Sequence, residues 1–237
     1  MTSQKGRLYL IPGPLGEGEV EQVIPDYNLQ IIRRLDAFVV EELRTARRFV
    51  RKCGFTGNFD ETALFVLNEH TAIEEVPSFL QPAIEGKDMG LISEAGCPAV
   101  ADPGSVLVRA AHESGIQVIP LPGPSSIMMS LMASGLNGQQ FTFHGYLPVK
   151  EPERIKKIKE IERDAHRTGQ AHIFIEAPYR NRQMIESITR NCMDQTVLSI
   201  SCNLTMPDEE IQTYTIYNWK KRNYNPQKKP AVFIISR

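Results

Sequence analysis

The 237-residue chain has few cysteines, no long apolar run and almost no net charge. Its four cysteines are scattered without a CxxC pair, which argues against a structural zinc site and a dense disulfide framework. No segment reaches the roughly 18 uninterrupted apolar residues that suggest a membrane span. The polar start runs directly into a strand-like segment, unlike a signal peptide. We therefore expect a cytoplasmic protein that binds neither metal nor membrane.

The charge balance gives little support for a nucleic-acid partner. The chain has 27 Lys and Arg against 28 Asp and Glu, a net charge of −1, whereas nucleic-acid binders usually carry a basic surplus. Two local clusters are nevertheless basic, at residues 47–52 and 220–229. Each can contact an anionic substrate or can simply be solvated surface, and both interpretations stay open.

Short apolar runs alternate with segments of helical periodicity in the first half of the chain. The alternation predicts a mainly parallel, doubly wound sheet. Strands are expected at residues 8–11, 37–40, 64–67, 89–92 and 116–121, the last of them buried. Helices are expected at residues 30–35, 46–53, 73–84 and 105–113, and a proline at position 82 should end the third one early.

The second half is richer in strands and predicts a mixed, partly antiparallel sheet. Its strands are expected at residues 141–148, 171–175, 196–202, 213–217 and 231–235, and its helices at 125–134, 153–167 and 182–192. We interpret Met128, Met129 and Met132 as core filler. The proline-rich segment 120–124 separates the halves, so we expect an N-terminal α/β domain, 1–120, and a C-terminal α/β domain, 121–237.

The loop from Ser93 to Gly104 connects an expected strand to an expected helix. Gly96 allows backbone conformations closed to other residues, and Asp102 should cap the helix with Pro103 at its first position. In open α/β sheets, ligands bind beyond the carboxyl ends of the strands, where this loop lies. A ligand-binding loop and an ordinary turn are both compatible with the sequence.

Five loop motifs occur in a recognisable order. They are a proline-glycine loop after the first strand, Ser-Glu-Ala-Gly-Cys-Pro…Asp-Pro-Gly, Leu-Pro-Gly-Pro-Ser-Ser, Phe-His-Gly-Tyr-Leu-Pro and Ile-Glu-Ala-Pro-Tyr-Arg. Together they resemble the tetrapyrrole (corrin/porphyrin) methylase superfamily. Within it they are most similar to the ribosomal small subunit methyltransferase I branch, which methylates a cytidine ribose 2′-hydroxyl in 16S rRNA. The resemblance implies two α/β domains, S-adenosyl-L-methionine in the cleft between them, and a homodimer.

The resemblance also implies which residues bind the cofactor. Cys97 is then a pocket residue and not a nucleophile, and the backbone of a late strand holds the adenine. The implied cofactor-binding residues are Leu15, Gly16, Glu94, Gly96, Cys97, Pro98, Val100, Ser125, Ser126, Glu176, Ala177, Pro230 and Ala231.

Methyl transfer from a sulfonium needs alignment, exclusion of water and a group that accepts the proton of the methyl acceptor. Glu41, Glu176 and Glu94 follow expected strands and are candidates for that group. Arg44 and Arg180 are candidates for holding an anionic group, although each residue can instead belong to a structural ion pair.

The chain departs from the RNA-directed branch in several loops. Where that branch has Glu-Asp-Thr-Arg, this chain has Glu41-Glu42-Leu43-Arg44. Three functions therefore stay open: a methyltransferase for ribosomal RNA, a methyltransferase for a tetrapyrrole-like or other small molecule, and a non-catalytic protein that binds S-adenosylmethionine.

Overall fold

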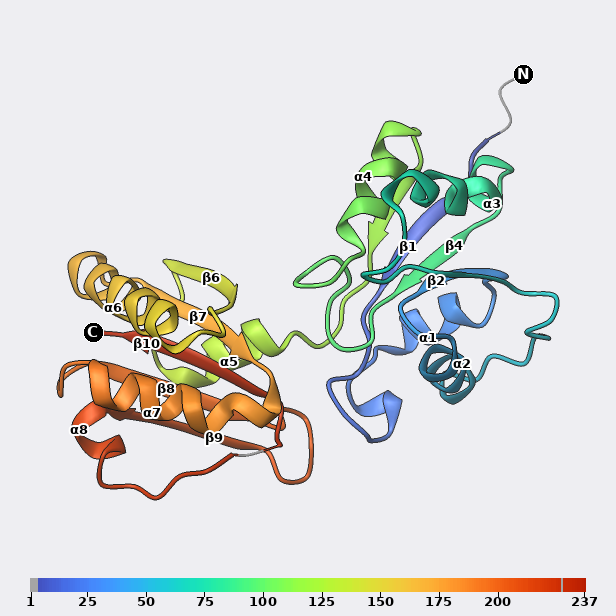
Figure 1. The fold of residues 1–237 in the computed structure, drawn as a ribbon. Helices are drawn as coiled ribbons and strands as arrows, with labels where there is room; N and C mark the ends of the chain where they lie inside the picture. The colour runs from blue at the N-terminus through green and yellow to red at the C-terminus, as the bar shows by residue number, and fades with distance from the viewer. Residues whose placement is uncertain (1–3, 227) are drawn as a thin grey trace. The chain divides into compact units, whose positions relative to one another are not determined.

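The computed structural model describes residues 4–226 and 228–237, which form two compact units, Met1–Ser125 and Ser126–Arg237 (Figure 1). Each unit contains one five-stranded sheet with helices packed on it, which confirms the predicted α/β class. Every helix in the described ranges is too short or too polar to span a bilayer.

The first unit is built on a fully parallel sheet with the strand order β3-β2-β4-β1-β5. Alternate residues of its strands pack to opposite faces, so Phe38 joins the core under α1 and α2, while Val39 joins the core under η2 and α4. Helices therefore cover both faces, as predicted. The strands are β1 (Arg7–Ile11), β2 (Ala37–Val40), β3 (Ala63–Val66), β4 (Met89–Ile92) and β5 (Gln117–Pro120). The helices are η1 (Val20–Gln22), α1 (Asp26–Ile32), α2 (Leu43–Lys52), η2 (Ile73–Leu80), α3 (Gln81–Ile84) and α4 (Ser105–Glu113).

Four expectations for the first unit were wrong, besides the cap at Asp102, which is described with the site. The helix expected at 30–35 lies instead at Asp26–Ile32. The strand at 116–121 is not buried: β5 is an edge strand that pairs only with β1, and Gln117 and Pro120 are exposed. Pro82 does not end a helix but stands in the first turn of α3, where its missing N–H costs nothing. Helix α2 begins at Leu43, earlier than expected, because the Glu42 carboxylate accepts hydrogen bonds from the backbone N–H groups of its first turn.

The second unit contains a mixed sheet with the order β6-β7-β10-β8-β9, in which only β6 and β7 are parallel neighbours. Helices α6 and α7 pack on one face of this sheet and α5 on the other (Figure 1). The strands are β6 (Phe141–Tyr146), β7 (Ala171–Glu176), β8 (Val197–Cys202), β9 (Glu210–Thr215) and β10 (Ala231–Ser236). The helices are α5 (Ser126–Ser134), α6 (Glu151–Thr168), η3 (Pro178–Arg180), α7 (Asn181–Asn191) and α8 (Ile216–Trp219).

Two expectations for the second unit were wrong. The strand at 213–217 ends at Thr215, whose hydroxyl accepts a hydrogen bond from the Asn218 N–H and so caps α8. The methionines are not all core filler, since the side chain of Met132 is 80% exposed and that of Met128 is 44% exposed. Helix α5 instead buries Leu131 against the sheet.

Candidate functional site

The loops that follow β1 and β4 are joined by two backbone hydrogen bonds. The N–H of Gly13 donates to the carbonyl of Gly96, and the N–H of Gly96 donates to the carbonyl of Gly13, both at 3.0 Å. A Cβ at position 13 would lie 2.3 Å from the carbonyl oxygen of Ser93, so only glycine fits there. Gly96 has a φ of +77°, and a Cβ there would contact the Leu15 side chain and the Pro124 carbonyl. The structure thus brings Leu15, Gly96 and the segment after β5 together.

The segment from Cys97 to Asp102 is held in an unusual backbone conformation. Ala99 and Ala101 both have positive φ values, of 65° and 56°, which is costly for alanine and typical of functional loops. The thiol of Cys97 donates to the Pro124 carbonyl at 3.6 Å, and burial raises the pKa of this thiol. Cys97 is therefore a neutral thiol and a poor nucleophile. Val100 is exposed, whereas Pro98 is buried.

Asp102 closes this loop and does not cap helix α4, so that expectation was wrong. Its Oδ1 accepts hydrogen bonds from the N–H of Ala99 at 3.2 Å and of Gly104 at 2.6 Å. Gly104 is the N-cap residue of α4, and no side chain caps this end of the helix. The carboxylate therefore stabilises the strained segment before the helix.

Glu41 and Asp102 form a pair of facing carboxyl groups. Glu41 Oε1 accepts a hydrogen bond from the N–H of Glu94 at 3.2 Å, and the Asp102 carboxyl is near enough to influence its protonation. The buried Oδ2 of Asp102 has no hydrogen-bond partner within the described part of the chain. Burial, aided by Asp102, raises the pKa of Glu41 to about 7.

A cavity of about 290 Å³ lies in the first unit beside these loops. Its apolar surface includes Phe49, while Arg48 and Lys52 are cations one helical turn apart on α2. Glu94 provides a carboxylate that accepts a hydrogen bond from the Thr45 hydroxyl at 2.5 Å. The cavity is lined by Pro14, Leu15, Gly16, Glu17, Gly18, Val20, Thr45, Ala46, Arg48, Phe49, Lys52, Ile92, Ser93, Glu94 and Ala95.

Of the predicted residues, Leu15, Gly16 and Glu94 line this cavity, whereas Arg44 does not. Arg44 is exposed; its backbone N–H donates to the Glu42 carboxylate, and its positive charge helps to lower the pKa of that group. Arg48 and Lys52 belong to the basic cluster at 47–52, and the cluster as a whole does not distinguish them from their neighbours. Their i, i+4 spacing, which places them on one side of the helix, is the signal that does.

The predicted residues of the second unit meet at one edge of its sheet. Ala231 is the register partner of Glu176 in the antiparallel β7–β10 pair, so Ala177 and Pro230 follow and precede them at the same edge. Glu176 is buried, and its Oε1 accepts hydrogen bonds from the Ala177 N–H at 2.7 Å and from Arg180 Nε at 2.8 Å. Because Arg180 already compensates this carboxylate, a proton-accepting role for Glu176 stays a prediction. Ser125 and Ser126 stand at the start of α5.

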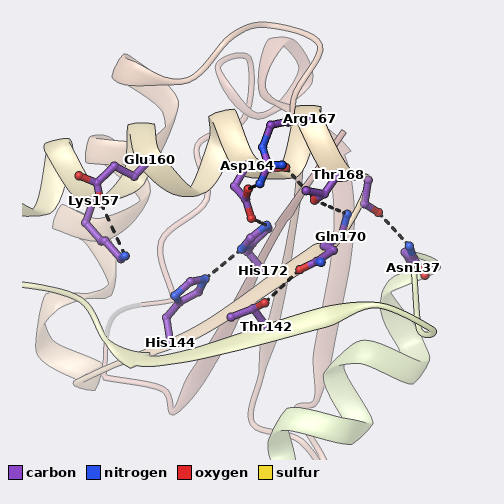
Figure 2. A network of polar contacts seen from close by, with 11 residues as sticks. Asn137, Thr142, His144, Lys157, Glu160, Asp164, Arg167, Thr168, Gln170 and His172 are labelled. Atoms are coloured by element: carbon purple, nitrogen blue, oxygen red, sulfur yellow. Dashed lines mark hydrogen bonds and ion pairs between the residues drawn. The ribbon is translucent and has the colours of Figure 1, made fainter.

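A histidine pair in the second unit was not anticipated from the sequence (Figure 2). His144 Nε2 and His172 Nδ1 are 2.9 Å apart, and His172 Nε2 lies 3.5 Å from Asp164 Oδ2. Burial lowers the pKa of His144 to about 4 and also lowers that of His172. Both rings are therefore neutral at pH 7. Strands β6 and β7 bring them together, and no local pattern predicts that contact.

In the described ranges, no cluster of three or more His, Cys, Asp or Glu side chains is arranged to hold a metal ion. All four cysteines are free thiols, and Cys53, Cys192 and Cys202 are buried.

A family model and curated relatives that match this chain all describe methyltransferases. The family model for tetrapyrrole (corrin/porphyrin) methylases matches residues 28–219. Ribosomal RNA small subunit methyltransferase I of Escherichia coli O157:H7 is 29% identical over 98% of this chain and 78% of its own length. The protein of the same name from Streptococcus pyogenes serotype M1 is 31% identical over 89% of this chain and 69% of its own length.

Solved structures show the same fold. The methyltransferase CobJ superposes with a TM-score of 0.63 at 16% identity, covering 97% of this chain and 93% of its own. Uroporphyrin-III C-methyltransferase from Thermus thermophilus gives a TM-score of 0.57, also at 16% identity, covering 98% of this chain and 92% of its own. At this identity the likeness concerns the fold alone.

Proposed function

We propose, starting from the fact that this chain belongs to the tetrapyrrole (corrin/porphyrin) methylase family and is a methyltransferase, that it methylates a ribose hydroxyl of ribosomal RNA with S-adenosylmethionine as donor. One observation carries the choice of RNA. Relatives that align with nearly the whole chain at 27–31% identity bear the name ribosomal RNA small subunit methyltransferase I.

The loops of the first unit fit such a donor. When bound, S-adenosylmethionine supplies a methyl group on an electrophilic sulfonium. Cys97 contributes a protonated thiol, because burial raises its pKa, so it does not compete for the methyl group as a thiolate would. Leu15 adds an apolar surface beside Gly96, and Val100 is exposed in the strained segment. These residues would hold the donor in the first unit, and Ala177 and Ala231 are the candidates in the second.

Glu41 is suited to accept the proton that the hydroxyl loses. A carboxyl with a pKa of about 7 is partly ionised at neutral pH and binds a proton more strongly than an ordinary glutamate. The hydrogen bond from the Glu94 N–H holds one oxygen in place. Asp102 raises the affinity of Glu41 for the proton, because uptake of one proton reduces the repulsion between the two neighbouring carboxylates.

The cavity beside α2 supports a phosphate-bearing acceptor. Arg48 and Lys52 line it, and an arginine offers paired donors to phosphate oxygens. Phe49 and Ile92 give it an apolar surface against which a base or sugar can pack, and Glu94 accepts hydrogen bonds. This combination matches a nucleotide better than an uncharged molecule.

The test is transfer of labelled methyl from S-adenosylmethionine into fractions of a lysate from cells that lack this gene. Label in small ribosomal subunits that is lost on digestion of their RNA is the expected result. Label in the small-molecule fraction alone would refute the RNA proposal and favour a tetrapyrrole-like acceptor. No transfer in any fraction, with cofactor binding by calorimetry, would favour the non-catalytic protein.

We also expect a homodimer, because the family resemblance implies one, and a cytoplasmic location, because the scattered cysteines suit a reducing compartment. Light scattering of the purified protein measures the oligomeric state directly, and the mass of a single chain, 26.7 kDa, would contradict the homodimer.

A further inference from the structure

A second cavity, of about 280 Å³, lies in the second unit between α7 and the chain that leaves α8. None of its residues is among those assigned above to methyl transfer. We call it the α7–α8 pocket. It is lined by Arg182, Ile185, Glu186, Thr189, Trp219, Lys220, Arg222, Asn223, Tyr224 and Asn225.

Arg222 of the pocket and Lys221, its neighbour in the sequence, are both held by aromatic rings. The guanidinium of Arg222 lies 3.8 Å from the centre of the Tyr214 ring, and the ammonium of Lys221 lies 3.6 Å from that of Tyr217. An aromatic ring attracts a cation without neutralising its charge. In the described part of the chain, neither Lys221 nor Arg222 takes part in an ion pair within 4.0 Å. Both charges are thus positioned and uncompensated.

The other two cations of the pocket differ in this respect. Lys220 pairs with Asp194 at 2.6 Å, and Arg182 pairs with Glu186 at 3.0 Å. Their charges are largely compensated, so the attraction that the pocket exerts on an anion comes mainly from Arg222, with Lys221 beside it in the sequence.

Packed aromatic side chains line the base of the pocket. Trp219 is buried, and its indole N–H donates to the Leu198 carbonyl at 2.8 Å. Its ring contacts those of Tyr214 and Tyr224, with centroids 5.5 Å and 5.3 Å away. Arg222 therefore rests on a packed aromatic side chain that keeps it in place, whereas Lys221 lies on the exposed ring of Tyr217.

Exposed amides complete the pocket. Asn223 and Asn225 are exposed, and each offers donors and acceptors to a ligand. Cations beside amides and aromatic rings suit a phosphodiester and the edge of an unpaired base, which is how proteins contact single-stranded RNA. A chain with a net charge of −1 needs such a local concentration of positive charge to attract RNA at all.

We propose that the α7–α8 pocket is a docking site for the phosphate backbone of a single-stranded segment of the RNA substrate. This inference rests on the proposed function and adds a binding site to it. The residues of the pocket contact the RNA but not the reacting atoms, so they contribute to affinity and leave the chemical step unchanged.

The experiment uses the full chain with the double substitution Lys221→Gln and Arg222→Gln. Its matched control is Arg109→Gln on α4, which also removes an exposed positive charge. Binding of a short labelled single-stranded RNA is titrated at several salt concentrations, and methyl transfer to small ribosomal subunits gives KM and kcat. We expect RNA affinity to fall about tenfold and the salt slope to fall by about 1.4, since each single-strand contact contributes about 0.7. We expect KM to rise with kcat unchanged.

A second variant guards against misfolding. Asn223→Asp places a negative charge at the pocket and leaves both cation–aromatic contacts intact, so it should weaken RNA binding in the same direction. Arg222→Lys keeps the charge and should retain most of the affinity.

The inference and the proposed function fail in different ways. Unchanged RNA affinity and salt slope in the double variant and in Asn223→Asp, with wild-type protein that methylates RNA, would overturn the pocket and leave the function intact. Wild-type protein that transfers no label to RNA would overturn the function. If Arg109→Gln lost as much RNA affinity as the double variant, the docking site would also be overturned. Positive charge anywhere on the surface would then be enough to bind RNA.

Discussion

We expect the histidine pair to make the second unit less stable in acid, and replacing His144 with glutamine to remove part of that sensitivity. The pair is shown in Figure 2. His144 Nε2 lies 2.9 Å from His172 Nδ1, so the bond needs one ring to donate and the other to accept. A glutamine amide nitrogen reaches about where Nε2 stands, and it donates without titrating.

The direction in which stability changes with pH follows from the lowered pKa of His144. The ordinary pKa of histidine is 6.5, and burial, the neighbouring His172 and Lys157 lower that of His144 to about 4, while Asp164 partly opposes them. The unfolded chain therefore binds a proton before the folded one. The stability from the neutral ring is complete above pH 6.5 and is lost as the pH falls through that window towards 4.

The size of the stability loss follows from the ordinary and the lowered pKa of His144. They differ by about 2.5 pH units, and each unit is worth about 1.4 kcal/mol, so full coupling would give about 3 kcal/mol. Because the His144 ring is only half-buried, solvent screening reduces the expected effect to about 1–2 kcal/mol. His172 has a lowered pKa of its own and will contribute in the same direction.

The assay is urea unfolding of wild type and His144→Gln near pH 7.5 and near pH 4.5, with the free energy of unfolding extrapolated to water. We expect the wild type to lose about 1–2 kcal/mol more than the variant between these two conditions. An identical loss in both proteins would mean that His144 titrates as it does in water, and the buried histidine pair would be refuted.

Three further predictions concern the sites described above. Glu41→Gln should lower kcat about 100-fold or more with unchanged affinity for S-adenosylmethionine. The wild-type rate should rise with pH through about 7, where Glu41 becomes ionised. A Glu41→Gln variant that kept the wild-type pH–rate profile would argue against Glu41 as the proton acceptor. Gly13→Ala should destabilise the first unit by about 2 kcal/mol or more and weaken cofactor binding, because its Cβ would lie 2.3 Å from the Ser93 carbonyl oxygen, and thermal unfolding with calorimetry measures both. Glu176→Gln leaves Arg180 without its carboxylate partner and should reduce turnover far more than cofactor affinity, whereas unchanged turnover would remove it from the mechanism.

The sequence alone determined most of the secondary structure and the class of fold. The strands at 37–40 and 89–92 and the helix at 105–113 have the bounds predicted for them, because buried strands and amphipathic helices carry their period locally. The five loop motifs also led to the family, since each is a short local stretch and their order along the chain is distinctive when they are taken together.

Errors arose where a local pattern competed with tertiary contacts. Asp102 stands where a helix cap is expected, yet its carboxylate bonds to the N–H of Ala99, which has a strained conformation, and faces Glu41. The strand at 116–121 has the apolar character of a buried strand, but its place at the edge of the sheet exposes part of it. For Asp102 the deciding contacts are the backbone conformation of its own loop and the neighbouring Glu41, and for the strand it is the order of strands in the sheet.

Only the tertiary structure decided how the candidate site is assembled. Parallel strands β2 and β4 are neighbours although β3 intervenes in the sequence, and this order places Glu41 against Glu94 and Asp102. The same holds for His144 and His172, which belong to different strands. The sequence could name the chemical groups, because residue type is local information. Their distances, burial and pKa values depend on which strands pair and which faces pack, and no short stretch of sequence carries that information.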